Sequence, residues 1–139
     1  MVVGGLAAGA VAHDQPPSYF FTETIGGILG GWVGGSMPDF IEPANSASHR
    51  KSAHSWTTLL VNSGALGADV GAGVSYLRES AARWRVRALD SSLQRGPRNA
   101  ATAMEYGCHF LAGLTIGFLA GYASHLMMDA ATPAGLPLA

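Results

Sequence analysis

The chain has 139 residues, the size of one domain; only 12% of them are charged, whereas 48% are hydrophobic. A net charge of −1 gives no general attraction to nucleic acid, so we predict no nucleic-acid partner, and a single cysteine excludes an internal disulfide. This composition is typical of a small membrane protein, although a glycine- and alanine-rich soluble bundle would share it.

Four apolar stretches with helical character follow one another, at residues 2–13, 23–37, 53–77 and 101–129. Pro16 and Pro17 are expected to end the first stretch and Pro38 the second, because proline has no backbone N–H and restricts the residue before it. No Lys or Arg precedes the first stretch, so we expect a retained helix and not a secretory signal. We therefore predict a compact all-α bundle of about four helices in one domain, residues 1–139.

Two of these stretches are long enough to cross a membrane. Trp56–Leu77 runs 22 residues with one charge, Asp69, and Cys108–Met128 runs 21 residues without Lys, Arg, Asp or Glu. At 1.5 Å per residue, each reaches the thickness of a hydrocarbon core, about 30 Å. Small and hydroxylated residues fill much of both stretches, so a buried soluble helix is the alternative to the membrane association that we expect.

Glycines recur every four residues in three of the stretches: Gly26, Gly30 and Gly34, with Gly27, Gly31 and Gly35 one step over, then Gly67 and Gly71, and finally Gly113, Gly117 and Gly121. A glycine inside a helix costs about 1 kcal/mol relative to alanine, so this spacing makes sense where another backbone comes very close. We predict Gly-xxx-Gly packing between helices, and self-association into a homo-oligomer through any glycine face left exposed.

Residues 78–105 form a basic connecting segment. They hold six of the eight Lys and Arg residues, and Gly96-Pro97 is expected to break any helix there. We interpret the segment as a solvated connection, with contact to anionic lipid as the alternative. If the apolar helices span a membrane, the positive-inside rule places this segment in the cytoplasm.

The chemistry-bearing residues gather in two segments. His125 and Asp129 are four apart in the last apolar stretch, so both project from one helical face. Asp39, His49 and His54 fall within 16 residues of a chain that has only five histidines. Imidazole and carboxylate suit zinc, and also manganese or iron, and burial without a partner is costly for such groups. Antiparallel pairing of residues 53–77 with 101–129 would bring His54 to His125 and Asp129.

Two neighbours of this ligand set have candidate catalytic roles. Glu42 is either a further ligand or a general base, and Arg50, next to Lys51, would hold an anionic substrate such as a phosphoester. Charge balance for Asp39 and Glu42 is an equally good reading of these cations. His109 lies about 24 Å along the helix from His125, too far to share the site, and is expected to be a hydrogen-bonded packing residue.

The same segments resemble the YdjM-like family, described as LexA-binding, inner-membrane-associated hydrolases. The resemblance rests on residues 34–39, 42–44, His49-Arg50, His54-Ser55 and 121–137, in this order and spacing. It implies a metal-dependent hydrolase in the inner (cytoplasmic) membrane of a bacterium. Family members often carry Asp-x-Asp-His where this chain reads Asp39-Phe40-Ile41-Glu42, which leaves the number of metal ions open. The His-x3-Asp pair is also similar to zinc-dependent phospholipase C, which implies phosphoester hydrolysis.

The sequence therefore predicts a membrane-associated hydrolase with one to three divalent ions, zinc being the first choice, held by Asp39, His49, His54, His125 and Asp129. Membrane lipid and a phosphoester or other anionic substrate are the expected partners. The rival hypothesis is a non-enzymatic membrane or scaffold protein in which the same His/Asp cluster has a structural role.

Overall fold

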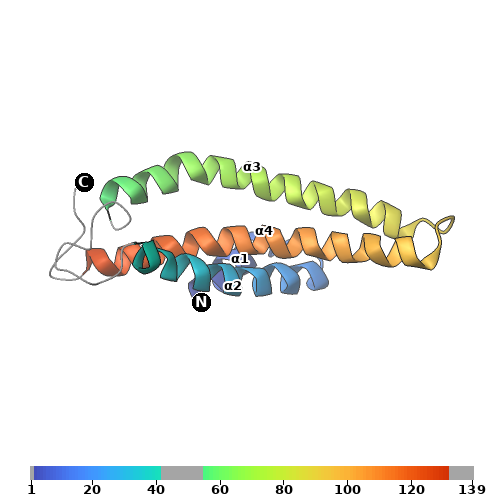
Figure 1. The fold of residues 1–139 in the computed structure, drawn as a ribbon, viewed down its shortest axis with the longest axis horizontal. Helices are drawn as coiled ribbons and strands as arrows, with labels where there is room; N and C mark the ends of the chain where they lie inside the picture. The colour runs from blue at the N-terminus through green and yellow to red at the C-terminus, as the bar shows by residue number, and fades with distance from the viewer. Residues whose placement is uncertain (1, 42–54, 132–139) are drawn as a thin grey trace.

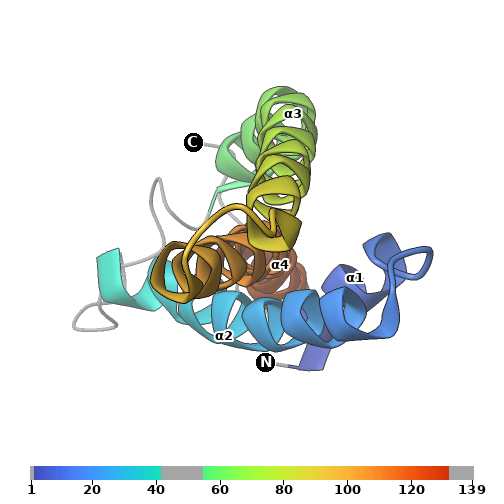
Figure 2. The ribbon, with the colours of Figure 1, turned by 90° about the vertical axis from the view of Figure 1, so that its right-hand side faces the viewer.

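The computed structural model describes residues 2–41 and 55–131, except for the side chains of Trp56 and residues 58–66. It is an all-α bundle of four helices, as predicted: α1 (Val2–Val11), α2 (Pro17–Ile41), α3 (Trp56–Leu89) and α4 (Arg95–Ala130). Figure 1 shows α4 running through the length of the molecule, with α3 along one side and α1 and α2 along the other. The end-on view in Figure 2 places α4 between these two layers.

α2, α3 and α4 are longer than the apolar stretches that predicted them, whereas α1 ends two residues earlier than its stretch. The prediction for residues 78–105 was wrong in one respect. Most of that segment is helix, because α3 continues to Leu89 and α4 begins at Arg95. Gly96 and Pro97 lie in the first turn of α4, where a missing backbone N–H removes no helical hydrogen bond, so they do not break the helix. Pro38 likewise does not end α2, which continues to Ile41.

The short turn between α3 and α4 is closed by Asp90. Its carboxylate accepts hydrogen bonds from the Ser92 hydroxyl at 2.6 Å and from the Ser92 backbone N–H at 2.9 Å. These two hydrogen bonds lower the pKa of Asp90. The turn makes α3 and α4 an antiparallel pair, as predicted.

Glycine faces hold α2 and α4 together, and the two helices run parallel. A Cβ atom on Gly113 would lie 1.9 Å from the carbonyl oxygen of Glu23, and one on Gly117 would lie 2.1 Å from that of Gly27. Glycine is therefore required at these positions, because a larger residue would meet backbone and not a side chain that can move. The predicted Gly-xxx-Gly packing is confirmed here, and α1 joins it through the contact of Gly4 with Gly27 and Gly31.

The glycines of α3 do not follow this pattern. Gly67, Gly71 and Gly73 have no atom of the described chain within 4 Å of the position that a Cβ would take. Among the described residues, α3 packs along α4 and not along the backbones of α1 or α2. The prediction that Gly67 and Gly71 meet a close backbone is wrong for the described chain.

The outer sides of α1 and α2 are apolar. Large side chains exposed there include Val2, Val3 and Leu6 on α1, and Phe21, Ile25, Leu29, Trp32 and Val33 on α2. Exposed apolar surface of this extent is typical of a face that meets lipid or protein. Among the described residues one helix, α4, is long and apolar enough to cross a membrane, although a core helix of a soluble protein passes the same test.

Candidate functional site

The first candidate site lies where α2 and α4 end. Because these helices run parallel, their C-terminal turns reach the same end of the bundle and bring Asp39 beside His125 and Asp129. A small apolar cluster fixes the two turns: Leu126 is completely buried and packs with Tyr122, and Met37 of α2 lies against both. The backbone arrangement therefore positions three of the five predicted ligands together.

His125 is the centre of this group. Its Nε2 atom lies 3.6 Å from Oδ1 of Asp39 and 3.4 Å from Oδ2 of Asp129. Exposure falls from 60% for the Asp39 side chain to 20% for His125 and 15% for Asp129. The group thus has a buried side on α4 and an open side at Asp39.

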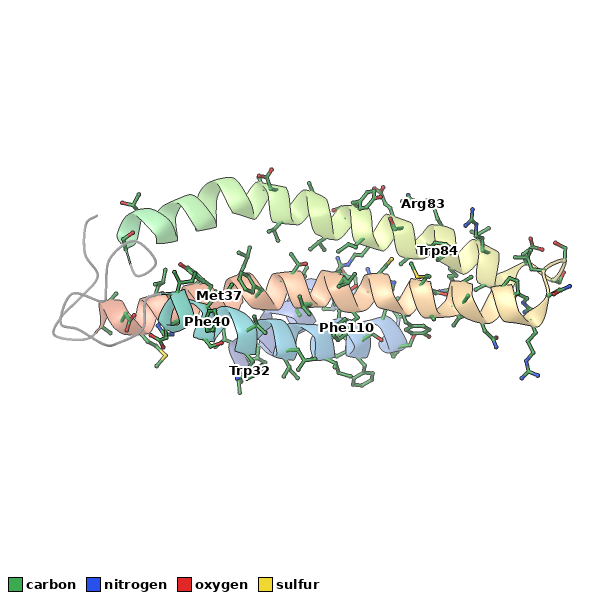
Figure 3. The ribbon with its side chains drawn as sticks, viewed as in Figure 1. Trp32, Met37, Phe40, Arg83, Trp84 and Phe110 are labelled. Carbon is green, nitrogen blue, oxygen red and sulfur yellow. The ribbon has the colours of Figure 1, made fainter. Side chains whose placement is uncertain are left out.

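A hollow of about 330 Å3 adjoins the open side. Its polar lining includes Ser36, Asp39 and His125, and its apolar lining includes Trp32 and Met128. Figure 3 shows Trp32 on the side of α2 that faces away from α3. This volume is at the lower end of the range for small-molecule sites, so a headgroup-sized molecule could reach the imidazole and the carboxylate.

The other predicted site residues lie outside the described residues. These are the expected ligands His49 and His54 and the expected catalytic residues Glu42 and Arg50. Within residues 2–41 and 55–131, no group of three or more His, Cys, Asp or Glu side chains is arranged to hold a metal ion. Asp39, His125 and Asp129 converge, but they do not make a complete site on their own.

A second polar cluster, which the sequence did not predict, lies inside the bundle. Glu23 of α2 is completely buried, and its carboxylate accepts hydrogen bonds from Arg78 Nε at 3.0 Å and Nη2 at 2.5 Å. His109 Nδ1 of α4 lies 2.7 Å from the same carboxylate, and Arg78 Nη2 also donates to the carbonyl of Val11 at 3.2 Å. One carboxylate therefore joins α2, α3 and α4, and Arg78 extends the connection to α1.

Tyr19 extends the cluster by one helical turn. Its ring stacks on His109 with centroids 4.0 Å apart, and its hydroxyl donates to Glu105 and accepts from Arg85 Nη1 at 2.6 Å. Glu23 is thus paired with an arginine from α3, and the Tyr19 hydroxyl links Glu105 to a second one, so that these interior polar groups have the partners that burial demands.

The spacing of these residues is the signal that could have revealed the cluster. Tyr19 and Glu23 are four apart, and so are Glu105 and His109, which places each pair on one helical face. The sequence analysis placed Arg78 in a solvated connecting segment. This was wrong for Arg78, because its side chain binds Glu23, which lies 55 residues earlier in the chain. His109 is confirmed as a hydrogen-bonded packing histidine.

Comparisons with known proteins give no relative for this arrangement. No protein-family model matches the chain, and neither a curated protein nor a solved structure does. What the two clusters do must accordingly be judged from their own geometry.

Proposed function

We propose that the chain is a membrane-associated hydrolase that depends on a divalent metal ion, with a phosphoester as its substrate class. The observation that carries this proposal is the position of His125 Nε2, at 3.6 and 3.4 Å from carboxylate oxygens of Asp39 and Asp129. Ligand atoms about 2.1 Å from a tetrahedral zinc ion lie about 3.4 Å from one another. Each of these two nitrogen–oxygen distances is therefore close to the distance between two ligands of one ion.

The remaining ligands in this proposal are His49 and His54, from the segment that joins α2 to α3. Three described groups and two histidines would exceed the three or four protein ligands of a single zinc ion. The set therefore allows either a second ion or one residue that does not bind the first ion. Zinc is the first choice, because imidazole and carboxylate together suit it.

Different residues of the chain would have different roles around the ion. A divalent ion supplies Lewis-acid polarisation of an ester bond and a nucleophile at neutral pH. Asp129, largely buried one turn from His125, would hold that imidazole in place, while exposed Asp39 borders the hollow by which a substrate enters. Arg50 would bind the anionic part of the substrate, and Glu42 would accept a proton.

Association with a membrane is supported by two features of the surface. The exposed faces of α1 and α2 are apolar, and α4 has the length and hydropathy of a spanning helix. Trp32 and Met128, two exposed apolar side chains, also line the hollow beside His125. This arrangement suits a site at the boundary between lipid and water, and we place the protein in a bacterial inner membrane.

The test is the metal content of the purified full-length chain in neutral detergent. We expect bound zinc after incubation and dialysis, and a loss of most of it in His125→Ala. His13→Ala is the matched control, because His13 is an exposed residue at the end of α1 and should not change the metal content. Hydrolysis of bis-p-nitrophenyl phosphate should stop on chelation and return with zinc. Equal metal content in wild type and His125→Ala would refute the proposal and favour a structural His/Asp cluster.

A further inference from the structure

Two exposed arginines in the C-terminal half of α3 belong neither to the proposed metal site nor to the buried cluster. Arg83 and Arg87 are four residues apart, so they share one face of the helix. Arg78 and Arg85, whose side chains bind residues of the buried cluster, are seven apart and share a different face. Among the described residues no ion pair joins Arg83 or Arg87 to a carboxylate, and this includes Glu79, one turn before Arg83. Both positive charges are therefore open to an anion from outside the chain.

Aromatic rings hold the two guanidinium groups beside a hollow of about 290 Å3. The Arg83 guanidinium lies 5.7 Å from the centroid of the Tyr76 ring and donates a hydrogen bond to Ser80 Oγ at 2.6 Å. The Arg87 guanidinium lies 5.0 Å from the centroid of the Trp84 ring. Figure 3 shows Arg83 and Trp84 in the half of α3 that leads into the turn with α4. A contact with a ring positions a guanidinium without neutralising it, so the hollow presents two positioned cations.

The hollow lies just beyond one end of the stretch that is long enough to cross a membrane. Arg78 of α3 and His109 of α4 are level with each other, because both bind the same buried carboxylate. α1 ends at this level too, since the carbonyl of Val11 accepts a hydrogen bond from Arg78. The stretch Cys108–Met128, which has no Lys, Arg, Asp or Glu, starts here and advances about 30 Å, the thickness of a hydrocarbon core. In a membrane that α4 crosses, the headgroup layer would begin at about Arg78.

The two guanidinium groups reach that layer, which is about 5–8 Å thick on each side of a bilayer. Ser80 and Trp84, which they contact, come two and six residues after Arg78, or about 3 and 9 Å along the helix. Helical side chains lean toward the N-terminus of their helix, which for α3 is the membrane side. Arg95, at the start of α4, is 14 residues from His109, or about 21 Å, and lies well beyond the headgroups.

We propose that this face of α3 binds the headgroup of an anionic phospholipid. The phosphate accepts hydrogen bonds from Arg83 and Arg87, and Tyr76 and Trp84 lie at the interface, where such rings are favoured. Two arginines without a carboxylate select an anionic headgroup over a zwitterionic one, whose own ammonium group opposes them. The position at the end of a membrane-length stretch favours a lipid phosphate over that of a nucleic acid. The proposal rests on the membrane association in the proposed function, but not on its metal site.

The matched variants are Arg83→Gln, Arg87→Gln and Arg95→Gln. Each removes one exposed positive charge and keeps a residue that favours a helix, so all three should fold. Arg95 does not line the hollow. A diffuse attraction of the basic segment for anionic lipid would weaken equally in all three variants, whereas the proposed site loses affinity only in the first two.

Two measurements on the full chain separate the site from membrane association as such. Flotation with phosphatidylcholine vesicles reads out membrane association, and native mass spectrometry in neutral detergent measures the affinity for phosphatidylglycerol and for phosphatidylcholine. We expect wild type to bind phosphatidylglycerol at least about fivefold more tightly than phosphatidylcholine. Arg83→Gln and Arg87→Gln should each weaken phosphatidylglycerol binding about fivefold, which corresponds to about 1 kcal/mol per arginine at a membrane surface. Arg95→Gln should match wild type.

Equal affinity for the two lipids, or equal weakening in Arg95→Gln, would overturn the site and leave membrane association intact. Failure of the wild type to float would overturn membrane association and this proposal together, whereas absence of bound zinc would refute only the proposed metal site. If inorganic phosphate or a short oligonucleotide displaced phosphatidylglycerol at an equal concentration, the hollow would not be a lipid site, and the proposal would again be overturned.

Discussion

Replacing Gly117 by alanine should loosen the contact between α2 and α4. The added Cβ would lie 2.1 Å from the carbonyl oxygen of Gly27 and 2.6 Å from its Cα. Real contacts of this kind do not fall below 3.0 Å, so the two backbones must separate by about 0.9 Å. A gap of that size removes between a quarter and a half of the dispersion energy at each affected contact.

The expected loss of stability follows from two opposing terms. Overpacking a tight interface costs about 1–3 kcal/mol, and the upper end applies because backbone meets backbone. The better helix propensity of alanine offsets about 1 kcal/mol of this loss in stability. We therefore expect Gly117→Ala to lower the free energy of unfolding by about 2 kcal/mol, or the Tm by about 6 °C for a chain of this size.

Gly107→Ala is the matched control, since Gly107 is in the same helix and has no described atom within 4 Å of its Cβ position. Gly107→Ala should gain only the better helix propensity of alanine, which raises the free energy of unfolding by about 1 kcal/mol and the Tm by about 3 °C. Thermal unfolding in neutral detergent, followed by circular dichroism, measures both variants. If Gly117→Ala raised the Tm as much as Gly107→Ala, the close contact between α2 and α4 would be refuted.

Three further predictions concern the buried cluster and the apolar face. Glu23→Gln leaves a buried arginine without its carboxylate and should cost about 3 kcal/mol in chemical unfolding, whereas the exposed Glu79→Gln should change stability by less than about 0.5 kcal/mol. Tyr19→Phe removes a hydroxyl that joins a carboxylate to an arginine and should cost about 1–3 kcal/mol, against almost nothing for Tyr106→Phe, whose ring is at the surface. If the outer face of α2 meets lipid, brominated phospholipid should quench Trp32 in a variant with no other tryptophan, and acrylamide should quench it poorly; the reverse result would contradict membrane association.

The sequence predicted the helices well because apolar periodicity and glycine spacing are local signals. The close contacts of Gly113 and Gly117 follow from the same four-residue repeat that the sequence displays. Gly71 repeats in the same way but meets no close neighbour, because the divergence of α3 from α4 depends on packing along the whole helix. Pro97 was misread since proline is compatible with the first turn of a helix, and that turn lies outside the apolar stretch.

The candidate site was predictable only in part. The four-residue spacing of His125 and Asp129 placed them on one face, but the approach of Asp39 depends on α2 and α4 running parallel with their ends level. The pairing of Glu23 with Arg78 was not predicted, because local periodicity carries no information about two residues that lie 55 positions apart. An arginine in a basic segment looks solvated until the tertiary structure surrounds it.

The parallel course of α2 and α4 has an electrostatic consequence at the end where Ile41 and Ala130 lie. The peptide dipoles of each helix add up to about half a negative charge at its C-terminus, and here the two termini lie together. Asp39 and Asp129 add two carboxylates at the same place. The N-terminus of α3, which is antiparallel to α4, lies at the same end and offsets part of this field, so the backbone contribution that remains is negative. The end of the bundle that holds His125 is therefore attractive to cations through its backbone as well as through its side chains.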